Sequence, residues 1–551
     1  MGGGDVERRR PNILIIISDQ ERAHMHWPPG WAERNLTTHY ERLIGCKGKK
    51  SSHPRSSVAF ANAFTPTTEC SPSRASLLTS SYPTDHGVMT TPGALDPKTD
   101  LGIGIEPESE YVVRPNLMRV LSHSTTKQAG YDVAWKGKFH LTPPLPRSLN
   151  TNAFMANLLK WYGCTSAWNP PDAGHRFGSE THETIDISSS DEESAEGDTE
   201  EESIMDFLAK HKVDPNDKSG KERQPFCLVA SLVNPHDVWS SPCFSHLSDE
   251  DFLRQTGYHP SEFESVPIDL PPNHGDDLAS KPTIQGLMRT ERVFGDLPTE
   301  PVEGSAGASQ ALRYVRFYGY LHKCVDMEIG LLLDALEETG QMDETIIVRM
   351  ADHGENALSH GLREKRMNAY DETMRIPLVI NFPADWFGGQ GEHSSTRTVP
   401  DLVSSIDILR TVLDFAGINH NDIPYRGRSL VPILKGEETA NEDDEVLFTF
   451  DEPLAPPGVP GYIRCIRTRR VKYSVYFSDE AGAVQYEMYD LEKDPNEMNN
   501  LIGPGDEPNE IWLQYHDRLR KLMAKMGAVP REFDWDEKTS PRPWSHCSIG
   551  T

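Results

Sequence analysis

Four short apolar runs, rich in β-branched residues, each stop at a cluster of polar side chains. They are NILIIISDQ (12–20), YDVAWKGKFH (131–140), FCLVASLVNPHD (226–237) and ETIIVRMADHGE (344–355). An apolar run without alternation is typical of a strand buried on both faces of a parallel sheet. Helical patterns lie between these runs, over 115–129 and 319–339. The sequence therefore predicts a doubly wound α/β sheet, with ligands bound beyond the carboxyl ends of its strands, where all four polar clusters fall.

The chain of 551 residues is too long for one small core, which indicates more than one domain. After a polar stretch at 437–445, the runs VLFTF, YIRCIRT, VKYSVYF and YEMYDL predict a small antiparallel sheet, closed by a helix over 510–527. The expected organisation is an N-terminal tail (1–10), a main α/β domain (11–440), a smaller α+β subdomain (441–530) and a polar tail (531–551). Within the main domain we expect an acidic disordered insertion at 188–203 and a surface excursion at 259–307.

Composition excludes several classes of partner. The chain has 55 Lys and Arg against 84 Asp and Glu, a net charge of −29, which argues against nucleic acid. Its eight cysteines include no CxxC pair, so neither a zinc knuckle nor a dense disulfide frame is indicated. No run approaches the roughly 20 apolar residues of a membrane span, and we expect no membrane partner. The apolar run 13–17 is too short for a signal peptide, which predicts a cytoplasmic protein, or a secretory one if the N-terminus is incomplete. The sequence leaves the oligomeric state open.

Two of the strand ends carry potential metal ligands. Asp19 and Gln20 end the first run, and Asp352 and His353 end the fourth. Two carboxylates that meet in one cleft repel unless they are paired, protonated or bound to a cation. Oxygen ligands suit Ca²⁺ or Mg²⁺, and an imidazole among them leaves Mn²⁺ open. The alternative is that each aspartate only caps the helix that follows its strand.

The stretch CSPSRASLLTS (70–80) places a cysteine where a helix is expected to begin. Pro72 suits a first helical turn, so Cys70 lies next to backbone N–H groups that favour an anion. Such a position lowers a thiol pKa and suits a thiolate nucleophile, and Arg74, one turn on, can reach back to residue 70. The alternative is that Cys70 is a small buried apolar residue.

The pattern Cys-x-Pro-Ser-Arg, followed by an apolar pair and Thr, resembles the signature of type I sulfatases in the alkaline-phosphatase superfamily. Further segments are similar to blocks of that family: AWKGKFHL, NPHD, ADHGE, 360–380 and 489–501. The resemblance spans 11–525 and implies a large, mostly parallel sheet sandwiched by helices, with a smaller C-terminal α+β subdomain. Ser80 stands where the family pattern usually has glycine. The ligand pairs Asp-Gln and Asp-His are similar to those of the choline-sulfatase and phosphonate-monoester-hydrolase branch.

The resemblance implies a modified nucleophile. Cys70 would be oxidised to formylglycine (3-oxoalanine) by a formylglycine-generating enzyme, and the aldehyde would be hydrated. One hydroxyl of this diol attacks sulfur, and deprotonation of the other then expels sulfate and regenerates the aldehyde. One divalent cation, Ca²⁺ in preference to Mn²⁺ or Mg²⁺, would be bound by this side chain together with Asp19, Gln20, Asp352 and His353.

Five further side chains receive roles by resemblance. Arg74 and Lys138 would hold the hydrated aldehyde, and His140 would manage the proton of its second hydroxyl. His236 and Lys365 would bind the sulfate oxygens or protonate the leaving group. Taken singly, each has a structural alternative: a surface lysine, a packed or turn histidine, or a solvated helix arginine. Their occurrence together, in the family's order, favours the functional interpretation.

The sequence thus predicts a sulfuric ester hydrolase acting on a small-molecule or saccharide sulfate ester. An aryl group, a sugar hydroxyl and a choline-like head all remain possible as the leaving alcohol. One alternative is a phosphonate monoester or phosphodiester hydrolase that uses the same site. Another is a catalytically inactive metal-binding protein, in which Cys70 is never oxidised and the acidic segment 188–203 recruits a partner.

Overall fold

A computed structural model describes most of the predicted elements. It covers residues 10–23, 27, 42–43, 54–91, 116–122, 130–141, 159, 162–165, 202–214, 216, 223–244, 247–290, 310–386, 396–419, 423–437, 444–452, 455, 459–478, 484–530 and 534–546. Within these residues, no helix combines the length and the apolar character that crossing a membrane requires.

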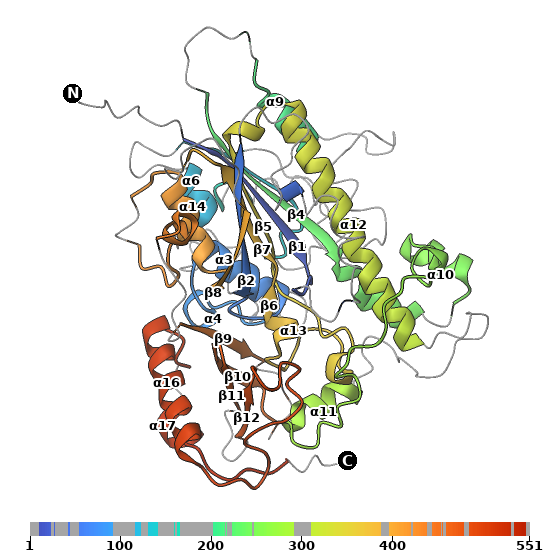
Figure 1. The fold of residues 1–551 in the computed structure, drawn as a ribbon, viewed down its shortest axis with the longest axis vertical. Helices are drawn as coiled ribbons and strands as arrows, with labels where there is room; N and C mark the ends of the chain where they lie inside the picture. The colour runs from blue at the N-terminus through green and yellow to red at the C-terminus, as the bar shows by residue number, and fades with distance from the viewer. Residues whose placement is uncertain are drawn as a thin grey trace, which may run out of the picture.

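The larger of two sheets has eight strands in the order β3-β4-β1-β5-β7-β2-β6, and β8 pairs with β2 (Figure 1). The bounds are β1 Asn12–Asp19, β2 Arg55–Phe64, β3 Asp132–Gly137, β4 Phe226–Pro235, β5 Thr345–Ala351, β6 Arg375–Ile376, β7 Leu378–Pro383 and β8 Thr396–Ser404. Strands β3, β4, β1 and β5 pair in parallel, whereas β7 is antiparallel to both β5 and β2. The prediction of a mixed, mostly parallel α/β sheet is confirmed.

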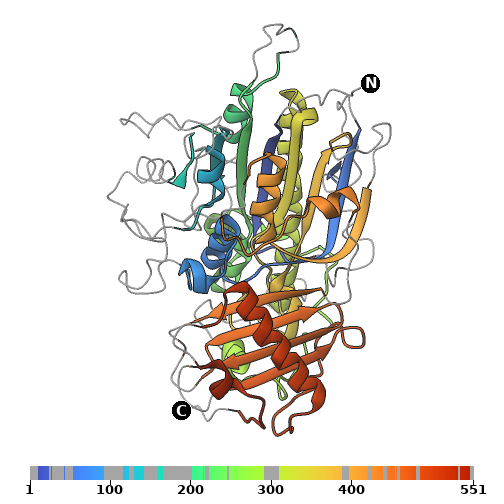
Figure 2. The same cartoon turned by 90° about the vertical axis from the view of Figure 1, so that its left-hand side faces the viewer.

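The central strand β1 is buried on both faces, as its unbroken isoleucine run predicts. Ile13, Ile15 and Ile17 belong to one hydrophobic core, and Leu14 and Ile16 to another. Helices on the two faces supply the rest of each core (Figures 1 and 2). They are α3 Cys70–Thr79, α6 Leu117–Ser122 and α14 Asp407–Phe415 on the first face, and α9 Ile204–Lys210 and α12 Gln310–Glu338 on the second.

The predicted helix over 319–339 lies within α12, which begins earlier, at Gln310. Of the helix expected over 115–129, the structure describes α6. Short helices complete the described part of the chain: α4 Pro83–His86, η1 His236–Phe244, α10 Asp249–Thr256, η2 Pro260–Glu262, α11 Thr283–Thr290, η3 Met342–Glu344, η4 Ser359–Gly361, α13 Asp371–Met374, α15 Val431–Lys435 and α17 Trp535–Thr539.

The smaller sheet is antiparallel and has the order β12-β11-β10-β9. Its strands are β9 Glu445–Asp451, β10 Tyr462–Thr468, β11 Val471–Phe477 and β12 Gln485–Asp490, and α16 Glu510–Met526 packs on one face (Figure 2). These are the four strands and the closing helix that the sequence predicts. The sheet begins five residues beyond the expected boundary at 440, at Glu445.

The structure corrects the prediction of a polar tail over 531–551, because part of this segment is packed into the core. Trp535 and Trp544 are each 5% exposed and belong to the core between the small sheet and α16. The indole N–H of Trp544 also donates a hydrogen bond to the carbonyl of Ile502, at 2.9 Å. Two large aromatic side chains bury enough apolar area to hold an otherwise polar segment in place.

We expect Trp544→Ala to lower the free energy of unfolding by about 3–5 kcal/mol, because it empties a buried indole site and leaves a carbonyl unpaired. Urea denaturation measures this effect. Leu513→Ala, at a side chain that is 51% exposed, is the matched control and should stay within about 0.5 kcal/mol. Equal effects of the two substitutions would mean that the segment is not anchored.

The predicted surface excursion at 259–307 is wrong for its first part. Asn273, Lys281 and Gln285 are fully buried. The ammonium of Lys281 donates to the hydroxyl of Tyr489 at 2.7 Å, and the amide of Gln285 donates to Glu487 at 3.1 Å. The segment therefore packs against the small sheet, because its few polar side chains find buried partners there. Residues 291–307, and 188–201 of the predicted acidic insertion, lie outside the described residues.

Candidate active site

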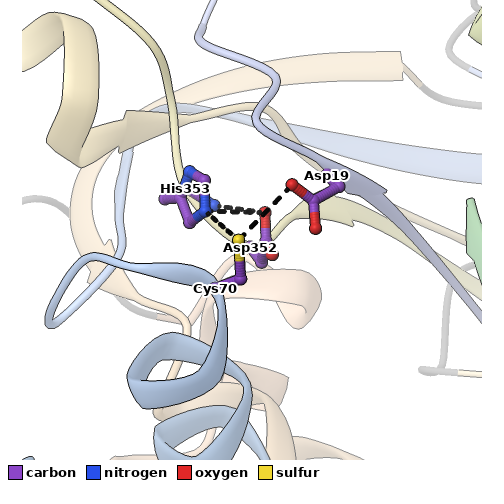
Figure 3. Close-up of side chains that lie close together, drawn as sticks. All are labelled: Asp19, Cys70, Asp352 and His353. Carbon is purple, nitrogen blue, oxygen red and sulfur yellow. Dashed lines mark hydrogen bonds and ion pairs between the residues drawn. The ribbon is translucent and has the colours of Figure 1, made fainter. Parts of the chain in front are cut away.

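The parallel pairing of β1 with β5 brings two aspartates together. Ser18 pairs with Ala351 in the last register position, so Asp19 and Asp352 leave the same edge of the sheet side by side. Helix α3 begins directly below this edge, and its first residue is Cys70 (Figure 3). Parallel strands put their carboxyl ends at one edge, which is why residues more than 300 positions apart meet there.

Four side chains form a group with the spacing of a metal site. One ligand atom from each of Asp19, Cys70, Asp352 and His353 lies within 4.8 Å of all the others, and all four residues are buried. The Cys70 sulfur is 3.2 Å from Nε2 of His353 and 3.7 Å from a carboxylate oxygen of Asp19. The other ring nitrogen of His353 lies 2.9 Å from the carbonyl of Gly354, which leaves Nε2 to face the group. Two carboxylates, one oriented imidazole and residue 70 fit a divalent cation, since one ligand atom of each lies within a few ångströms of the others.

Gln20 lies in a hydrogen-bond network beside this group. Its backbone N–H donates to Asp352 at 3.1 Å, and its side-chain amide donates to Glu355 at 2.6 Å. Its side-chain oxygen accepts a hydrogen bond from Lys365 at 2.5 Å. Gln20 also has a positive φ of 65°, so the chain turns sharply at the end of β1. Its predicted role as a metal ligand stays a prediction.

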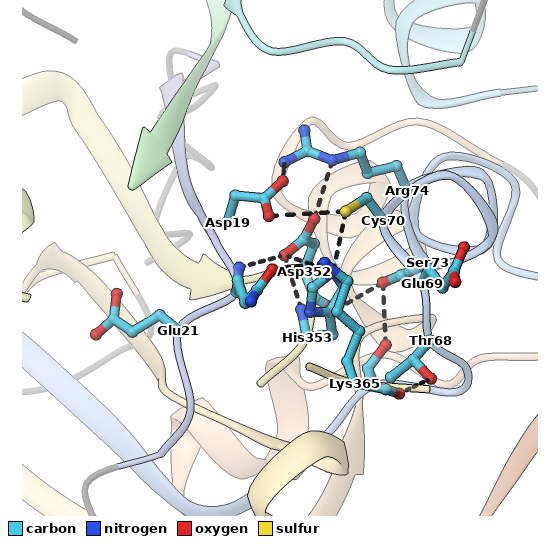
Figure 4. Close-up of polar contacts among 12 residues, drawn as sticks. Asp19, Glu21, Thr68, Glu69, Cys70, Ser73, Arg74, Asp352, His353 and Lys365 are labelled. Atoms are coloured by element: carbon cyan, nitrogen blue, oxygen red, sulfur yellow. Dashed lines mark hydrogen bonds and ion pairs between the residues drawn. The ribbon is translucent and has the colours of Figure 1, made fainter. Parts of the chain in front are cut away.

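Three cationic side chains, Arg74, Lys138 and Lys365, lie around the carboxylates, and Figure 4 shows the first and the last of them. Arg74 bridges them, with one nitrogen 2.8 Å from Asp19 and another 3.0 Å from Asp352. The ammonium of Lys138 is 2.7 Å from Asp19 and 3.8 Å from the sulfur of Cys70. Arg74 and Lys138 are fully buried and Lys365 is 6% exposed, which excludes the alternatives of surface lysines and a solvated helix arginine.

This charge arrangement keeps Asp19 ionised. Burial raises the pKa of its carboxyl, but the charges of Lys138 and Arg74 help to outweigh burial and hold that pKa well below its usual value. The pKa of Lys365 is shifted in the opposite direction. Burial lowers the pKa of its ammonium, but Cys70 and Glu364 outweigh burial and raise it. Both side chains are therefore charged at neutral pH.

The two predicted histidines lie at the ends of β3 and β4. Burial and the charge of Lys138 lower the pKa of both His140 and His236 well below the ordinary value. Both imidazoles are therefore neutral at pH 7, and a neutral imidazole can accept a proton. The predicted roles of these two residues stay predictions.

Ser80 at the other end of α3 occupies the position where glycine is usual. It has left-handed backbone angles (φ 50°, ψ 44°), which favour glycine. Its hydroxyl donates to the carbonyl of Ile406 at 2.7 Å and accepts from the backbone of Gly427 at 3.0 Å. A Cβ at Gly427 would lie 2.2 Å from the Ile406 oxygen, so glycine is required at 427 for this close approach. The two hydrogen bonds offset the strained backbone of Ser80 and fasten the helix that presents Cys70.

Sequence reasoning missed an ion-pair chain beside the site. Glu69, next to Cys70, lies 2.6 Å from the guanidinium of Arg366, next to Lys365. Arg366 also pairs with Glu452, which follows β9 of the small sheet. The hydroxyl of Thr68 donates to the backbone carbonyl of Lys365 at 2.8 Å. In the sequence, the only signal for these residues is that they lie next to Cys70 or Lys365, because no spacing pattern connects the segment at 68–70 with the segment at 365–366.

We expect Glu69→Gln to lower kcat by roughly tenfold, because the segments that carry Cys70 and Lys365 lose their ionic link and reacting groups shift. The free energy of unfolding should change by less than about 1 kcal/mol, since Arg366 is partly exposed to solvent. Steady-state kinetics and urea denaturation on the same preparation separate the two effects. A loss of activity that only follows a loss of stability would contradict the positioning role.

The fold and the site together define a metal-dependent hydrolase of the alkaline-phosphatase superfamily. A model of the family described as Sulfatase matches residues 11–418. A second model, described as N-sulphoglucosamine sulphohydrolase, C-terminal, matches residues 358–525. The chain belongs to the sulfatase family, and the predicted class of enzyme, a hydrolase of sulfate esters, is confirmed.

Characterised relatives and solved structures agree with this assignment. The chain is 26% identical to the choline-sulfatase of Rhizobium meliloti (strain 1021), over 90% of this chain and 84% of that protein. It is 22% identical to the N-acetylglucosamine-6-sulfatase of Homo sapiens, over 97% and 89%. The structure of BT4656 in complex with its substrate D-glucosamine-2-N,6-O-disulfate has a TM-score of 0.59 at 21% identity, covering 94% of this chain and 98% of that one. The phosphonate monoester hydrolase of Silicibacter pomeroyi has a TM-score of 0.58 at 23% identity, covering 95% and 96%. These structures share the fold.

Proposed function

We propose that the protein hydrolyses sulfated saccharides with formylglycine, formed from Cys70, as the nucleophile and one Ca²⁺ ion as cofactor. The observation that carries this proposal is the position of the Cys70 sulfur. It lies 3.2 Å from Nε2 of His353, 3.7 Å from Asp19 and 3.8 Å from the ammonium of Lys138. In the oxidised residue, an oxygen takes the place of this sulfur. That oxygen would meet metal ligands on one side and a cation on the other.

Asp19, Asp352, His353 and residue 70 would hold the cation, with Gln20 as the fifth ligand. Calcium is the proposed ion because most of these donors are oxygens and Ca²⁺ accepts irregular, oxygen-rich ligand sets. When bound, the cation polarises a sulfuryl oxygen and favours the ionised nucleophile. The carboxylate of Asp19 is already ionised in its buried position, so the protein offers the cation a preformed negative site.

The protein's own side chains supply the remaining chemistry. Arg74 and Lys138 would orient the two hydroxyls of residue 70, since both reach the Asp19 carboxylate beside it. Lys365 would bind a sulfate oxygen, because its ammonium is charged. Such preorganised donors contribute on the order of 10²–10³-fold each to the rate.

The two neutral histidines would move protons. His140 would accept the proton of the second hydroxyl, because the lowered pKa of its imidazole keeps it unprotonated at pH 7. His236 would face the leaving-group oxygen and hydrogen-bond to it. The formylglycine itself requires a formylglycine-generating enzyme, which we propose as the protein's processing partner.

The proposed substrate class rests on the relatives. Besides the human N-acetylglucosamine-6-sulfatase, the chain is 32% identical to the N-acetylglucosamine-6-O-sulfatase of Bacteroides thetaiotaomicron, over 41% of this chain and 38% of that protein. Sulfated saccharides are the substrates that these names indicate. Choline sulfate is the second possibility, because of the similarity to choline-sulfatase.

Phosphonate monoesters are the second candidate reaction. The chain shares its fold with the phosphonate monoester hydrolases of Silicibacter pomeroyi and Agrobacterium radiobacter. It is also 24% identical, over 90% of its length, to the multifunctional alkaline phosphatase superfamily protein PehA of Trinickia caryophylli. The test compares kcat/KM for 4-nitrophenyl sulfate and 4-nitrophenyl phenylphosphonate, with metal content measured on the same sample. We expect the sulfate to be preferred and about one calcium per chain, since the site offers one ligand group. A preference for the phosphorus ester by orders of magnitude would replace the proposed reaction with the second candidate.

A further inference from the structure

A second cavity lies at the junction of the two sheets, away from the cation site. Its volume is about 330 Å³, within the range of small-molecule binding sites. The end of β8, the first turn of α14, the loop 425–428, the start of β9 and the last turn of α16 enclose it. Ser80, at the far end of α3 from Cys70, is hydrogen-bonded to Ile406 and Gly427 in its lining. The length of α3, about 15 Å, therefore separates the two sites.

Basic side chains from three elements line this cavity. They are Arg410, Arg426, Arg428 and Lys525. Arg426 is paired through Nε with Asp85 at 2.9 Å. Arg410 and Lys525 make no ion pair with any residue in the described part of the chain. Four cations around one cavity stand out in a protein whose net charge is −29, and concave walls strengthen their local field.

The lining also holds three acidic side chains, Asp407, Asp444 and Glu445. Asp407 accepts hydrogen bonds from the backbones of Ser404 at 2.9 Å and Arg428 at 2.8 Å, one on each carboxylate oxygen. Burial raises the pKa of Asp407 to about 6, although the charges of Arg428 and Arg410 act to lower it, so its carboxylate is still mostly ionised at pH 7. Glu445 pairs with Arg518, outside the lining, at 2.9 Å. Four basic side chains thus stand against three acidic ones in the lining, and one of the three acidic side chains, Glu445, is paired with an arginine outside it.

The remaining lining residues could pack against a ligand of about the size of one sugar ring. Tyr82, Tyr425, Leu522 and Met526 form apolar and aromatic walls. The hydroxyl of Ser404 has no hydrogen-bond partner in the described part of the chain. Guanidinium groups bind planar or tetrahedral oxyanions through paired N–H donors, and aromatic walls pack against the body that carries the anion.

We propose that this cavity is a non-catalytic binding site for a sulfate group, either free sulfate or the sulfate of a sugar. The choice of sulfate among oxyanions rests on the proposed function, whereas the preference for an anion rests on the four basic side chains. A ligand here would contact the loop that anchors Ser80 and hence the helix that presents Cys70. The site would hold a second sulfate of the substrate, or the released product, at a fixed distance from the reaction.

The test is calorimetric titration of the Cys70→Ala variant, which binds without turnover. The probes are N-acetylglucosamine 6-sulfate, sodium sulfate and unsulfated N-acetylglucosamine. We expect two equivalents of the sulfated sugar to bind, and one after Arg410→Gln is added. If the number of sulfate ions bound from sodium sulfate also falls by one after Arg410→Gln is added, the result would support the site with free sulfate as its ligand.

Lys525→Gln is the second variant, because Lys525 is solvent-exposed and makes no described ion pair, so its loss should leave the fold intact. It should weaken one of the two binding events by roughly threefold to tenfold. The proposal would be overturned if Cys70→Ala and its Arg410→Gln and Lys525→Gln derivatives gave identical titrations. It would also be overturned if the unsulfated sugar bound equally well at the site that Arg410→Gln removes. In the Cys70 form, both substitutions should leave kcat for 4-nitrophenyl sulfate unchanged. A parent enzyme that fails to hydrolyse this ester would contradict the proposed function, while the titrations would still report on the cavity.

Discussion

Replacement of Cys70 by alanine should abolish the hydrolysis of sulfate esters. The substitution removes the atom that lies between His353, Asp19 and Lys138, and with it the proposed nucleophile. Loss of a nucleophile lowers kcat by roughly 10⁴–10⁶-fold. Turnover of 4-nitrophenyl sulfate by protein co-produced with a formylglycine-generating enzyme measures the effect.

Two companion variants sharpen this prediction. Cys70→Ser keeps one hydroxyl but has no second hydroxyl to expel sulfate, so we expect sulfate to accumulate on the protein without sustained turnover. Cys465→Ala is the matched control, because Cys465 is equally buried but lies in the small sheet. Activity that survives in Cys70→Ala, or falls equally in Cys465→Ala, would rule out residue 70 as the nucleophile.

Asp19→Asn should produce the second largest effect. The carboxylate is a proposed ligand of the cation and is also the partner of the buried cations Arg74 and Lys138. We expect kcat/KM to fall by on the order of 10³-fold or more, because both the metal and the arrangement of the cations are lost. Calcium affinity should fall by at least about 100-fold, since loss of even an outer partner of a metal ligand costs 10–100-fold.

Calcium titration of the metal-depleted protein separates binding from catalysis. In the parent, added calcium should restore the activity lost on treatment with a chelator, whereas in Asp19→Asn it should not. Asp517→Asn, at a half-exposed aspartate of α16, is the control and should behave as the parent. Unchanged calcium affinity in Asp19→Asn would place the cation elsewhere.

The strand ends could be predicted because each buried strand has a clear sequence signal, an unbroken apolar run that stops at polar residues. An unbroken apolar run precedes both Asp19 and Asp352, and such a run predicts a strand buried on both faces. Parallel pairing of the two strands then brings the two aspartates together. The same reasoning places Lys138 at the end of β3. The start of α3 at Cys70 follows from the proline at 72.

Other features depend on tertiary contacts that leave no local pattern. Strand β2 alternates irregularly and pairs with β7 and β8, which come more than 300 residues later. The link between Glu69 and Arg366 joins segments that only the finished fold brings together. The burial of Lys281 likewise depends on Tyr489, far along the chain, so a Pro- and acid-rich segment resembles a surface loop in sequence.

The central claim is that residue 70 is an aldehyde when the enzyme is active. Trypsin should release residues 56–74 as one peptide, which contains the single cysteine in question. Mass spectrometry of active protein from its native host should find this peptide with an aldehyde in place of the thiol, and a hydrazide probe should label it. A fully active preparation whose residue 70 is a thiol that iodoacetamide alkylates after digestion would contradict the account.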